Sequence, residues 1–370
     1  MSRVIEKRQK LLGLMREKTL EKGFFTVTDI AGASGVPRST AQDWVSRFLE
    51  EGCVIVREEQ KGRQAAHYVA ASALPKTACR RIFTTVDGDC VEIYHVCMSA
   101  GCASFCEFHH STGGGVLKNV MREGTTLRER AHFGMKDVEV GLYPKPAVAV
   151  TGVSQEGNRI IQHIRSVGGP AYSLTDMMSR ARGVIEVKVK KNGPYVDGEI
   201  VTEALDYYLI GIDDTDSGEQ GATFAVALAL LQHLAKMDGV IPIGHRVVML
   251  NPDLLEKTAG NSCSYVEIAA TPGSMDRIHD TVIRFVADET GSAEWGVAVK
   301  KGFLIGNELR KYGMRARMEI LSEADAVGEA GRNAIMLSGG RGRIGALAAV
   351  SMANLPIEYL LDPMKKSRSY

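Results

Sequence analysis

The sequence predicts a multidomain protein of the α+β or α/β class. At 370 residues the chain exceeds the usual size of one hydrophobic core. The composition is globular, with 45% hydrophobic and 24% charged residues. The hydrophobic pattern changes twice along the chain, which indicates a helix-rich part at 1–75, an α+β part at 77–205 and a part of layered strands and helices at 206–370.

Charge and cysteine content narrow the class of protein. The net charge of +1 gives no global argument for binding to nucleic acid or membrane. No apolar run is long enough to span a bilayer, and the N-terminal MSRVIEKRQK lacks the apolar core of a signal peptide. We therefore expect a cytoplasmic protein whose seven cysteines are thiols, ligands or nucleophiles before they are disulfides.

The first part predicts three helices followed by a hairpin. Helical periodicity covers Val4–Lys22, a short helix ends near Ala33, and Arg38–Leu49 carries an apolar stripe at helical spacing. Two strands are expected at Cys53–Val56 and Ala66–Val69. This order, together with the segment TDIAGASGVPRSTAQDWVSRFLEEG, resembles winged helix-turn-helix domains.

That resemblance implies a nucleic-acid-binding module. In such domains short polar residues at the start of the third helix read the major groove. Here the bases of DNA or RNA are expected to meet Arg38, Ser39, Thr40 and Gln42, and the phosphates Lys61 and Arg63. The alternative is a docking or dimerisation module that would make a homodimer, because a fold alone does not fix function.

The middle part predicts an α+β domain. Strand-like runs occur at Val91–Val96, Ala147–Val153 and Val184–Val189. Helix-like runs occur at Arg159–Ser166 and Leu174–Ala181.

A cysteine cluster lies in this middle part. Cys97, Cys102, Cys106 and His109 could together hold Zn²⁺ or an iron–sulfur cluster if they converge, although their spacing matches no standard pattern. One alternative is a set of buried structural cysteines in a helix of small residues. Another is a cysteine nucleophile with His109 or His110 as its base.

From Tyr207 onward strands and helices alternate. Strands are expected at Tyr207–Ile212 and Tyr265–Ala270, and helices at Thr223–Lys236, Met275–Ala287 and Ile344–Ala353. Such a pattern is typical of helices packed on the faces of a sheet.

Three acidic residues follow the first of these strands. Asp213, Asp214 and Asp216 lie within four positions, so their carboxylates repel one another unless a cation binds them. Mg²⁺ needs only one or two protein carboxylates beside waters and phosphate oxygens. An ordinary helix cap is the alternative. The remaining residues that we expect to contact a nucleotide here, where a helix N-terminus favours phosphate, are Gly211, Thr215, Ser217, Gly221 and Thr223.

A glycine-rich segment near the end matches G-x-G-x-x-G at Gly340, Gly342 and Gly345. Only 25 residues (370 minus 345) follow it, too few for the rest of a dinucleotide-binding domain. Glycines still permit close approach of a phosphate, and Arg341 and Arg343 could bind it in a fork. The alternative is a tight turn with solvated arginines.

Three separated blocks carry a resemblance to a known family. GIDDTDS at 211–217, LNPDLLEKTAGN at 250–261 and GRIGALAAV at 342–350 resemble the kinase-like domain of archaeal tRNA-isoleucine 2-agmatinylcytidine synthetase. The resemblance covers about residues 207–362. The GIDDTD segment is also similar to that of the methanogenesis marker protein group.

The resemblance implies use of ATP and Mg²⁺ to phosphorylate a cytosine carbonyl oxygen in tRNA, after which agmatine displaces the phosphate. It places metal and nucleotide at the three aspartates, and a threonine that is itself phosphorylated at Thr223. Lys257, Thr258 and Asn261 match its KTRGN block, which here reads KTAGN and lacks the arginine. The family's OB-fold and zinc ribbon, which hold tRNA, have no counterpart in these 370 residues, so the acceptor stays open.

We therefore expect a kinase- or ligase-like enzyme that uses ATP and Mg²⁺ to phosphorylate or activate a carbonyl or amide acceptor, tied to archaeal RNA modification or to methanogenesis-related maturation. One alternative is a winged-helix transcription regulator with a nucleotide-sensing C-terminal domain. Another is a metal- or Fe–S-binding assembly factor that uses ATP. The enzyme is favoured because Thr223, Lys257 and Asn261 occur together with the aspartates.

Overall fold

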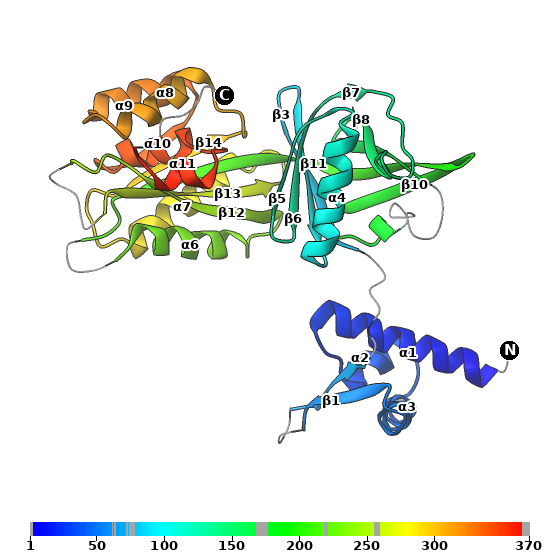
Figure 1. The fold of residues 1–370 in the computed structure, drawn as a ribbon. Coiled ribbons are helices and arrows are strands. Elements are labelled where there is room, and N and C mark those ends of the chain that lie inside the picture. Colours follow the sequence, from blue (N-terminus) through cyan, green and yellow to red (C-terminus); the bar gives the residue numbers. More distant parts are fainter. Residues whose placement is uncertain are drawn as a thin grey trace. The chain divides into compact units, whose positions relative to one another are not determined.

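The computed structural model describes residues 3–60, 62, 64–71, 73, 78–167, 177–217, 221–254 and 260–364 (Figure 1). The chain divides into two compact units, Met1–Arg80 and Arg81–Tyr370. Among the described residues, no helix combines the length and the apolar character that crossing a membrane requires.

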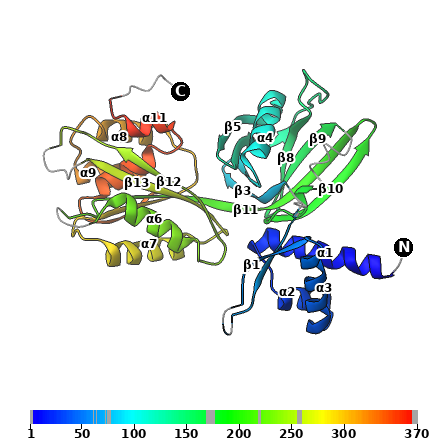
Figure 2. The same cartoon turned by 60° about the horizontal axis from the view of Figure 1, so that its bottom comes forward.

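The first unit contains the three expected helices and the hairpin (Figure 2). Their bounds are α1 Arg3–Lys22, α2 Val27–Ser34, α3 Arg38–Glu50, β1 Val54–Glu58 and β2 His67–Ala70. Helix α2 begins at a reciprocal cap, in which the Thr26 hydroxyl accepts from the Asp29 amide while the Asp29 carboxylate accepts from the Thr26 amide. The fully buried side chains that hold the helices together include Met15, Phe25, Ile30, Val45 and Phe48.

The second unit begins with a large sheet built around one long strand, β11 (Tyr195–Asp213). On one side of β11 the order is β3 (Cys79–Asp87), β4 (Cys90–Cys97), β6 (Thr126–His132) and β5 (Leu117–Glu123). On the other side it is β9 (Arg159–Val167), β8 (Val148–Glu156) and β7 (Gly134–Met135), and β10 (Val184–Asn192) also pairs with β11. Helix α4 (Ala100–Gly113) packs on β4, β5, β6 and β8.

The prediction of a helix over Arg159–Ser166 is wrong. These residues form β9, which pairs antiparallel with β8 and with β11. The β-branched Ile160, Ile161 and Ile164 are buried and fit a pleated surface, which outweighs their apparent helical spacing. The other expected helix, Leu174–Ala181, has residues 174–176 outside the described residues.

The last part of the second unit is a three-layer sandwich. Its antiparallel sheet has the order β12 (Val240–Met249), β13 (Ser262–Ala270), β11, β14 (Gly296–Lys301) and β15 (Met336–Gly339). Helices α6 (Thr223–Leu234) and α7 (Met275–Glu289) pack on one face. The other face carries α8 (Asn307–Ala316), α9 (Glu323–Arg332), α10 (Arg343–Ser351) and α11 (Ile357–Leu361) (Figure 1).

Side-chain alternation along β11 explains this sandwich. Tyr208 and Ile210 enter the core formed with α6 and α7, whereas Tyr207 and Leu209 enter the core on the opposite face. Both faces of the strand are therefore apolar, as expected for a central strand. The strand ends at Asp213, so the acidic segment emerges at one edge of a rigid sheet.

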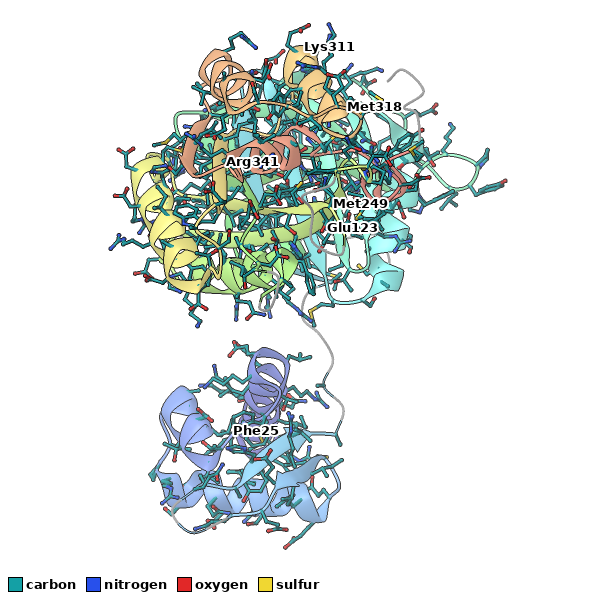
Figure 3. All side chains as sticks on the ribbon, turned by 90° about the vertical axis from the view of Figure 1, so that its left-hand side faces the viewer. Phe25, Glu123, Met249, Lys311, Met318 and Arg341 are labelled. Carbon is teal, nitrogen blue, oxygen red and sulfur yellow. The ribbon has the colours of Figure 1, made fainter. Side chains whose placement is uncertain are left out.

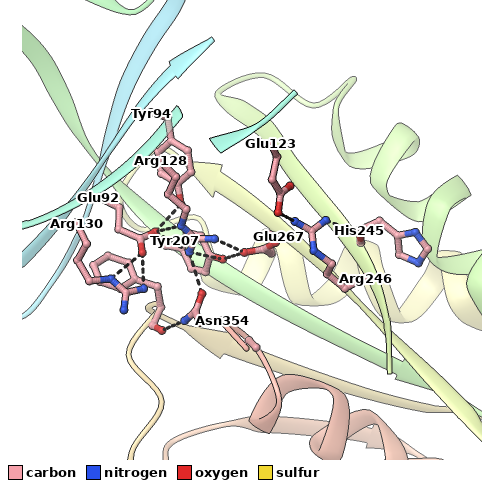
Figure 4. A network of polar contacts seen from close by, with 12 residues as sticks. Glu92, Tyr94, Glu123, Arg128, Arg130, Tyr207, His245, Arg246, Glu267 and Asn354 are labelled. Carbon is pink, nitrogen blue, oxygen red and sulfur yellow. Dashed lines mark hydrogen bonds and ion pairs between the residues drawn. The ribbon is translucent and has the colours of Figure 1, made fainter. Parts of the chain in front are cut away.

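A buried ionic network joins β6 and β4 to this sandwich (Figure 4). The guanidinium of Arg128 donates to Glu92 at 2.8 Å, to Glu267 at 2.9 Å and to Asn354 at 3.1 Å. Burial acts to raise the pKa of Glu92, but the charges of Arg128 and Arg130 outweigh it and lower that pKa. The ionised network therefore holds the sheet around β4 against the strand β13.

Candidate functional site

The site begins at the C-terminal end of β11. Asp213 is the last residue of the strand and pairs with Gly296 of β14. Burial of its carboxyl group raises the pKa of Asp213 well above its usual range, and the charges of Asp214 and Asp216 raise it further, against a backbone hydrogen bond from Asp214. Such a group resists ionisation unless a cation comes to it.

Asp214 turns the chain away from the strand. Its φ of 56° lies in the left-handed region, which a non-glycine residue adopts at some cost. Burial raises the pKa of this half-buried aspartate, as do the charges of Asp216 and Glu294, while Arg341 lowers it. Four charged groups from three segments therefore act on one another here.

Thr215 and Thr223 fix the end of the acidic segment. Thr215 is fully buried, and its amide and hydroxyl lie 3.4 Å and 3.2 Å from Oγ1 of Thr223, the first residue of α6. The Thr223 hydroxyl in turn donates to Oδ1 of Asp216 at 3.2 Å. Gly221, with φ of 95°, lets the chain pass close to Asp216, because a Cβ there would lie 3.3 Å from the Asp216 Cα.

Glycines let helix α10 lie directly on the strands. An ideal Cβ on Gly345 would be 1.7 Å from Oδ2 of Asp213, and one on Gly211 would be 2.0 Å from the Ala346 carbonyl oxygen. A Cβ on Gly296 would be 1.9 Å from the carbonyl carbon of Gly342. These contacts leave no room for a methyl group, so the glycines bring the 339–342 loop against the acidic segment.

The backbone donors of this loop are already engaged. The amide of Gly340 donates to the Trp295 carbonyl at 2.8 Å, that of Arg341 to the Glu294 carboxylate at 2.9 Å and that of Gly342 to the Glu294 carbonyl at 2.7 Å. An anion at this loop would therefore meet side chains before amides.

The two arginines of the loop point in different directions. Arg341 lies beside α10 and lines a cavity together with the acidic segment (Figure 3). The guanidinium of Arg343 donates to the Gly340 carbonyl at 3.0 Å and pairs with Glu323 of α9. Arg343 is not among the lining residues that the structure describes, so the expected fork of two arginines is not formed at the cavity.

This cavity encloses about 900 Å³, including solvent at its mouth. It brings the three sequence blocks together, since it is lined by Asp213, Asp214, Asp216, Asn261, Arg341, Gly342 and Gly345 from the expected set. The remaining lining residues were not singled out in the sequence: Leu250, Asn251, Leu254, Gly260, Ser262, Ala316, Glu319, Ile320, Leu321 and Ile344.

The other expected nucleotide contacts lie around the cavity or outside the described residues. Gly211 and Thr215 pack behind it, and Lys257 and Thr258 fall in 255–259, which the structure does not describe. Asn261 donates from Nδ2 to the carbonyl of Asn251 at 2.8 Å. This bond ties together the two described ends of the LNPDLLEKTAGN block. Asn251 belongs to that block, so the motif could have drawn attention to it.

The cysteine cluster forms only in part as expected. Hydrogen bonds from Cys106 and then Cys97 lower the pKa of Cys102 to about 3, against the effect of burial, and the charge of His95 adds to this. His109 is turned elsewhere, because its Nδ1 accepts from the Ala147 amide at 3.1 Å. The three cysteines therefore approach one another without His109, and a metal or cluster there stays a prediction.

The residues expected to meet nucleic acid lie at the start of α3. Arg38, Ser39 and Gln42 are exposed and Thr40 is half-buried. Lys61 and Arg63 lie outside the described residues.

Comparison with known proteins supports the resemblance predicted for about residues 207–362. Residues 209–281 match the family model of the TiaS TCKD domain. The tRNA-isoleucine 2-agmatinylcytidine synthetase TiaS of Pyrobaculum neutrophilum is 30% identical over 147 residues, which are 38% of this chain and 34% of that protein. An uncharacterized protein of Methanocaldococcus jannaschii is 25% identical over 248 residues, which are 64% of this chain and 81% of that protein.

Among solved structures, the crystal structure of TiaS in complex with an isoleucine tRNA and ATP is 25% identical, with a TM-score of 0.35, and the match covers 39% of this chain and 36% of that one. The chain spans 34% to 39% of the length of the curated TiaS relatives that it matches. The similarity to TiaS therefore concerns one domain.

Proposed function

We propose that this chain binds ATP and Mg²⁺ in the cavity beside Asp213 and uses them to phosphorylate or otherwise activate a carbonyl or amide acceptor on RNA. The observation that carries the proposal is the meeting of Asp213, Asp214 and Asp216 with Asn261 and Arg341 in one cavity. These residues come from three blocks far apart in the chain, each similar to a block of an ATP-using RNA-modifying family.

The electrostatics of the cavity support a cation. Burial and mutual repulsion raise the pKa values of Asp213 and Asp214, and Arg341 is the lining residue whose charge opposes this for Asp214. A polyphosphate would add further negative charge. Mg²⁺ suits such a site because it takes one or two carboxylates and completes its octahedron with phosphate oxygens and waters.

The proposed reaction is a phosphoryl transfer. An acceptor oxygen attacks the γ-phosphorus of ATP, the bond from that phosphorus to the β–γ bridging oxygen breaks, and ADP leaves with the electron pair. The chain would contribute mainly position and charge neutralisation. Asp213 and Asp214 would hold the cation, Arg341 would contact phosphate, and Thr223 would keep Asp216 oriented through its hydrogen bond.

A calorimetric titration of the full chain with ATP tests this proposal. We expect ATP to bind in Mg²⁺ buffer and to lose most of its affinity in EDTA. Asp214→Asn should weaken binding in Mg²⁺ about tenfold, the loss of about 1.4 kcal/mol of interaction with the cation. Asp280→Asn, on the exposed side of α7, is the matched control and should bind as the wild type does. Equal ATP affinity with and without Mg²⁺ would refute the proposed site.

We propose in addition that residues 1–75 form a winged helix-turn-helix module that binds the RNA acceptor. Support comes from the order of helices and hairpin and from the exposed polar start of α3. An RNA acceptor agrees with the TiaS relatives, which are named as tRNA synthetases of 2-agmatinylcytidine. The transcription-regulator alternative would instead need duplex DNA at the same helix.

Fluorescence anisotropy with a labelled tRNA transcript distinguishes these possibilities. Arg38→Gln should weaken binding several-fold and reduce the slope of log affinity against log salt by about 0.7 to 0.9, the loss of one phosphate contact. Arg8→Gln, on α1 and already paired with Glu51, is the control and should leave the slope unchanged. Tighter binding of duplex DNA than of tRNA would favour the regulator.

A further inference from the structure

Three potential metal ligands of different chemistry lie at one end of the β4–β6 pair. Asp89 precedes β4, Cys90 begins it and His132 ends β6, where it is paired in register with Cys90. Asp89 belongs to the turn after β3, which allows its side chain to reach the same side as that of Cys90. The ligand atoms of the three residues all lie within 4.8 Å of one another.

The separations of these atoms match one face of a zinc tetrahedron. Cys90 Sγ lies 3.5 Å from His132 Nδ1, the Asp89 carboxylate lies 3.4 Å from the same nitrogen, and Cys90 Sγ lies 3.7 Å from Asp89 Oδ1. Zinc bonds of about 2.3 Å to sulfur, about 2.0 Å to nitrogen and about 2.0 to 2.2 Å to oxygen, at tetrahedral angles, place the ligands about 3.3 to 3.7 Å apart.

Hydrogen bonding alone serves this arrangement poorly. A neutral imidazole nitrogen either donates one proton or accepts one. His132 Nδ1 nevertheless faces both a thiol and a carboxylate at nearly equal distances. A cation at the centre of the three atoms would satisfy all of them at once, because thiolate, imidazole and carboxylate are all zinc ligands.

The charge around Cys90 also favours a cation. Burial raises the pKa of Cys90, and the charges of Asp89 and Asp87 add to this, while Arg130 opposes them. The guanidinium of Arg130 is itself engaged by Glu92. The thiol is therefore held protonated by its surroundings until a positive charge reaches it, as metal coordination provides.

Exposure leaves a path for an ion to enter. Cys90 is buried, whereas the side chains of His132 and Asp89 are 45% and 82% exposed. The protein would thus supply three ligands from a rigid sheet edge and leave the fourth position toward solvent. Three protein ligands with one open position are typical of zinc sites that bind a water or a small ligand.

We propose that Asp89, Cys90 and His132 form a Zn²⁺-binding site whose fourth ligand is water or a small anion. This site is separate from the cavity beside Asp213, and it does not depend on the function proposed for that cavity. It is also separate from the Cys97, Cys102 and Cys106 group, which lies at the other end of β4 and on α4.

Titration of the chelator-stripped full chain with Co²⁺ tests the proposal. Co²⁺ takes the same ligands as Zn²⁺ and gives visible bands and a thiolate charge-transfer band when a cysteine binds it. We expect one equivalent of Co²⁺ with such bands, displaced by one equivalent of Zn²⁺. His132→Ala should lower the affinity at least about 100-fold, because even the loss of a residue that only supports a ligand costs 10- to 100-fold.

Matched variants separate this site from other thiols. Cys90→Ser should remove the charge-transfer band, whereas Cys102→Ser and Cys53→Ser should keep it. Because Cys90 is buried and its replacement could unfold the chain, Asp89→Ala provides a second variant at an exposed residue, checked by circular dichroism. The proposal is overturned if His132→Ala and Asp89→Ala bind Co²⁺ as tightly as the wild type. It is equally overturned if the band disappears in Cys102→Ser.

Discussion

Replacing Asp213 by Asn is expected to reduce Mg²⁺-dependent ATP turnover about a thousandfold without weakening the metal-free fold. The carboxylate packs against the backbone of α10 at Gly345, where an amide of the same shape also fits. The amide cannot ionise and is a poor Mg²⁺ ligand, so the charge that would position the phosphates is lost. A loss of about 4 kcal/mol of transition-state stabilisation corresponds to that factor.

The same substitution should change how stability depends on pH. The pKa of Asp213 is raised in the folded protein above its unfolded value of about 3.9, so the folded state holds this proton more tightly. The contribution of Asp213 to the stability of the metal-free protein is therefore greatest at low pH. It falls as pH rises through the interval from about 3.9 to the raised value. Asp213→Asn lacks this term.

Thermal unfolding in EDTA across pH measures the effect. The melting temperature of Asp213→Asn, minus that of the wild type, should grow as pH rises, and saturating Mg²⁺ should reverse its sign by stabilising the wild type alone. Asp280→Asn on α7 is the control and should follow the wild type in both buffers. A variant that keeps turnover, or that melts in parallel with the wild type at every pH, would remove Asp213 from the proposed metal site.

Local sequence patterns predicted the segments of the site better than they predicted its contacts. The apolar strand ending at Asp213, the helix from Thr223 and the glycine-rich entry to α10 all follow from short-range periodicity. Glu294 could not be found in this way. It lies in the loop before β14 and meets Arg341 through a carboxylate–amide bond between segments 47 positions apart.

Side-chain direction was equally hidden. Arg341 and Arg343 look equivalent in the sequence, but Arg343 is the first residue of α10 and turns toward Glu323, while Arg341 stays at the cavity. Likewise Glu319 and Leu321 line the cavity without belonging to any motif, since their position depends on how α8 and α9 pack on the sheet. Close packing of distant elements therefore decides which members of a motif face the cavity.

The approach of α10 to Asp213 makes Gly345→Ala the most informative steric variant. The added Cβ would lie 1.7 Å from Oδ2 of Asp213, so either the carboxylate or the helix must move. We expect a loss of about 1 to 3 kcal/mol in the free energy of unfolding, as for other overpacked interiors. ATP turnover should fall about a hundredfold, because a displacement near 1 Å of a positioning group has that effect. Chemical denaturation and steady-state turnover measure the two losses.

Two further variants identify the carboxylate as the cause. Gly328→Ala, in the middle of α9, meets only the far end of Arg332 at 3.7 Å and should stabilise the protein by about 0.5 to 1 kcal/mol through the higher helix propensity of alanine. In an Asp213→Ala background the added methyl of Gly345→Ala no longer meets a carboxylate, so its cost in stability should shrink, giving a coupling energy of about 1 kcal/mol or more. If Gly345→Ala costs the same in both backgrounds, the helix clashes with the strand itself, and the carboxylate does not depend on Gly345 for its position.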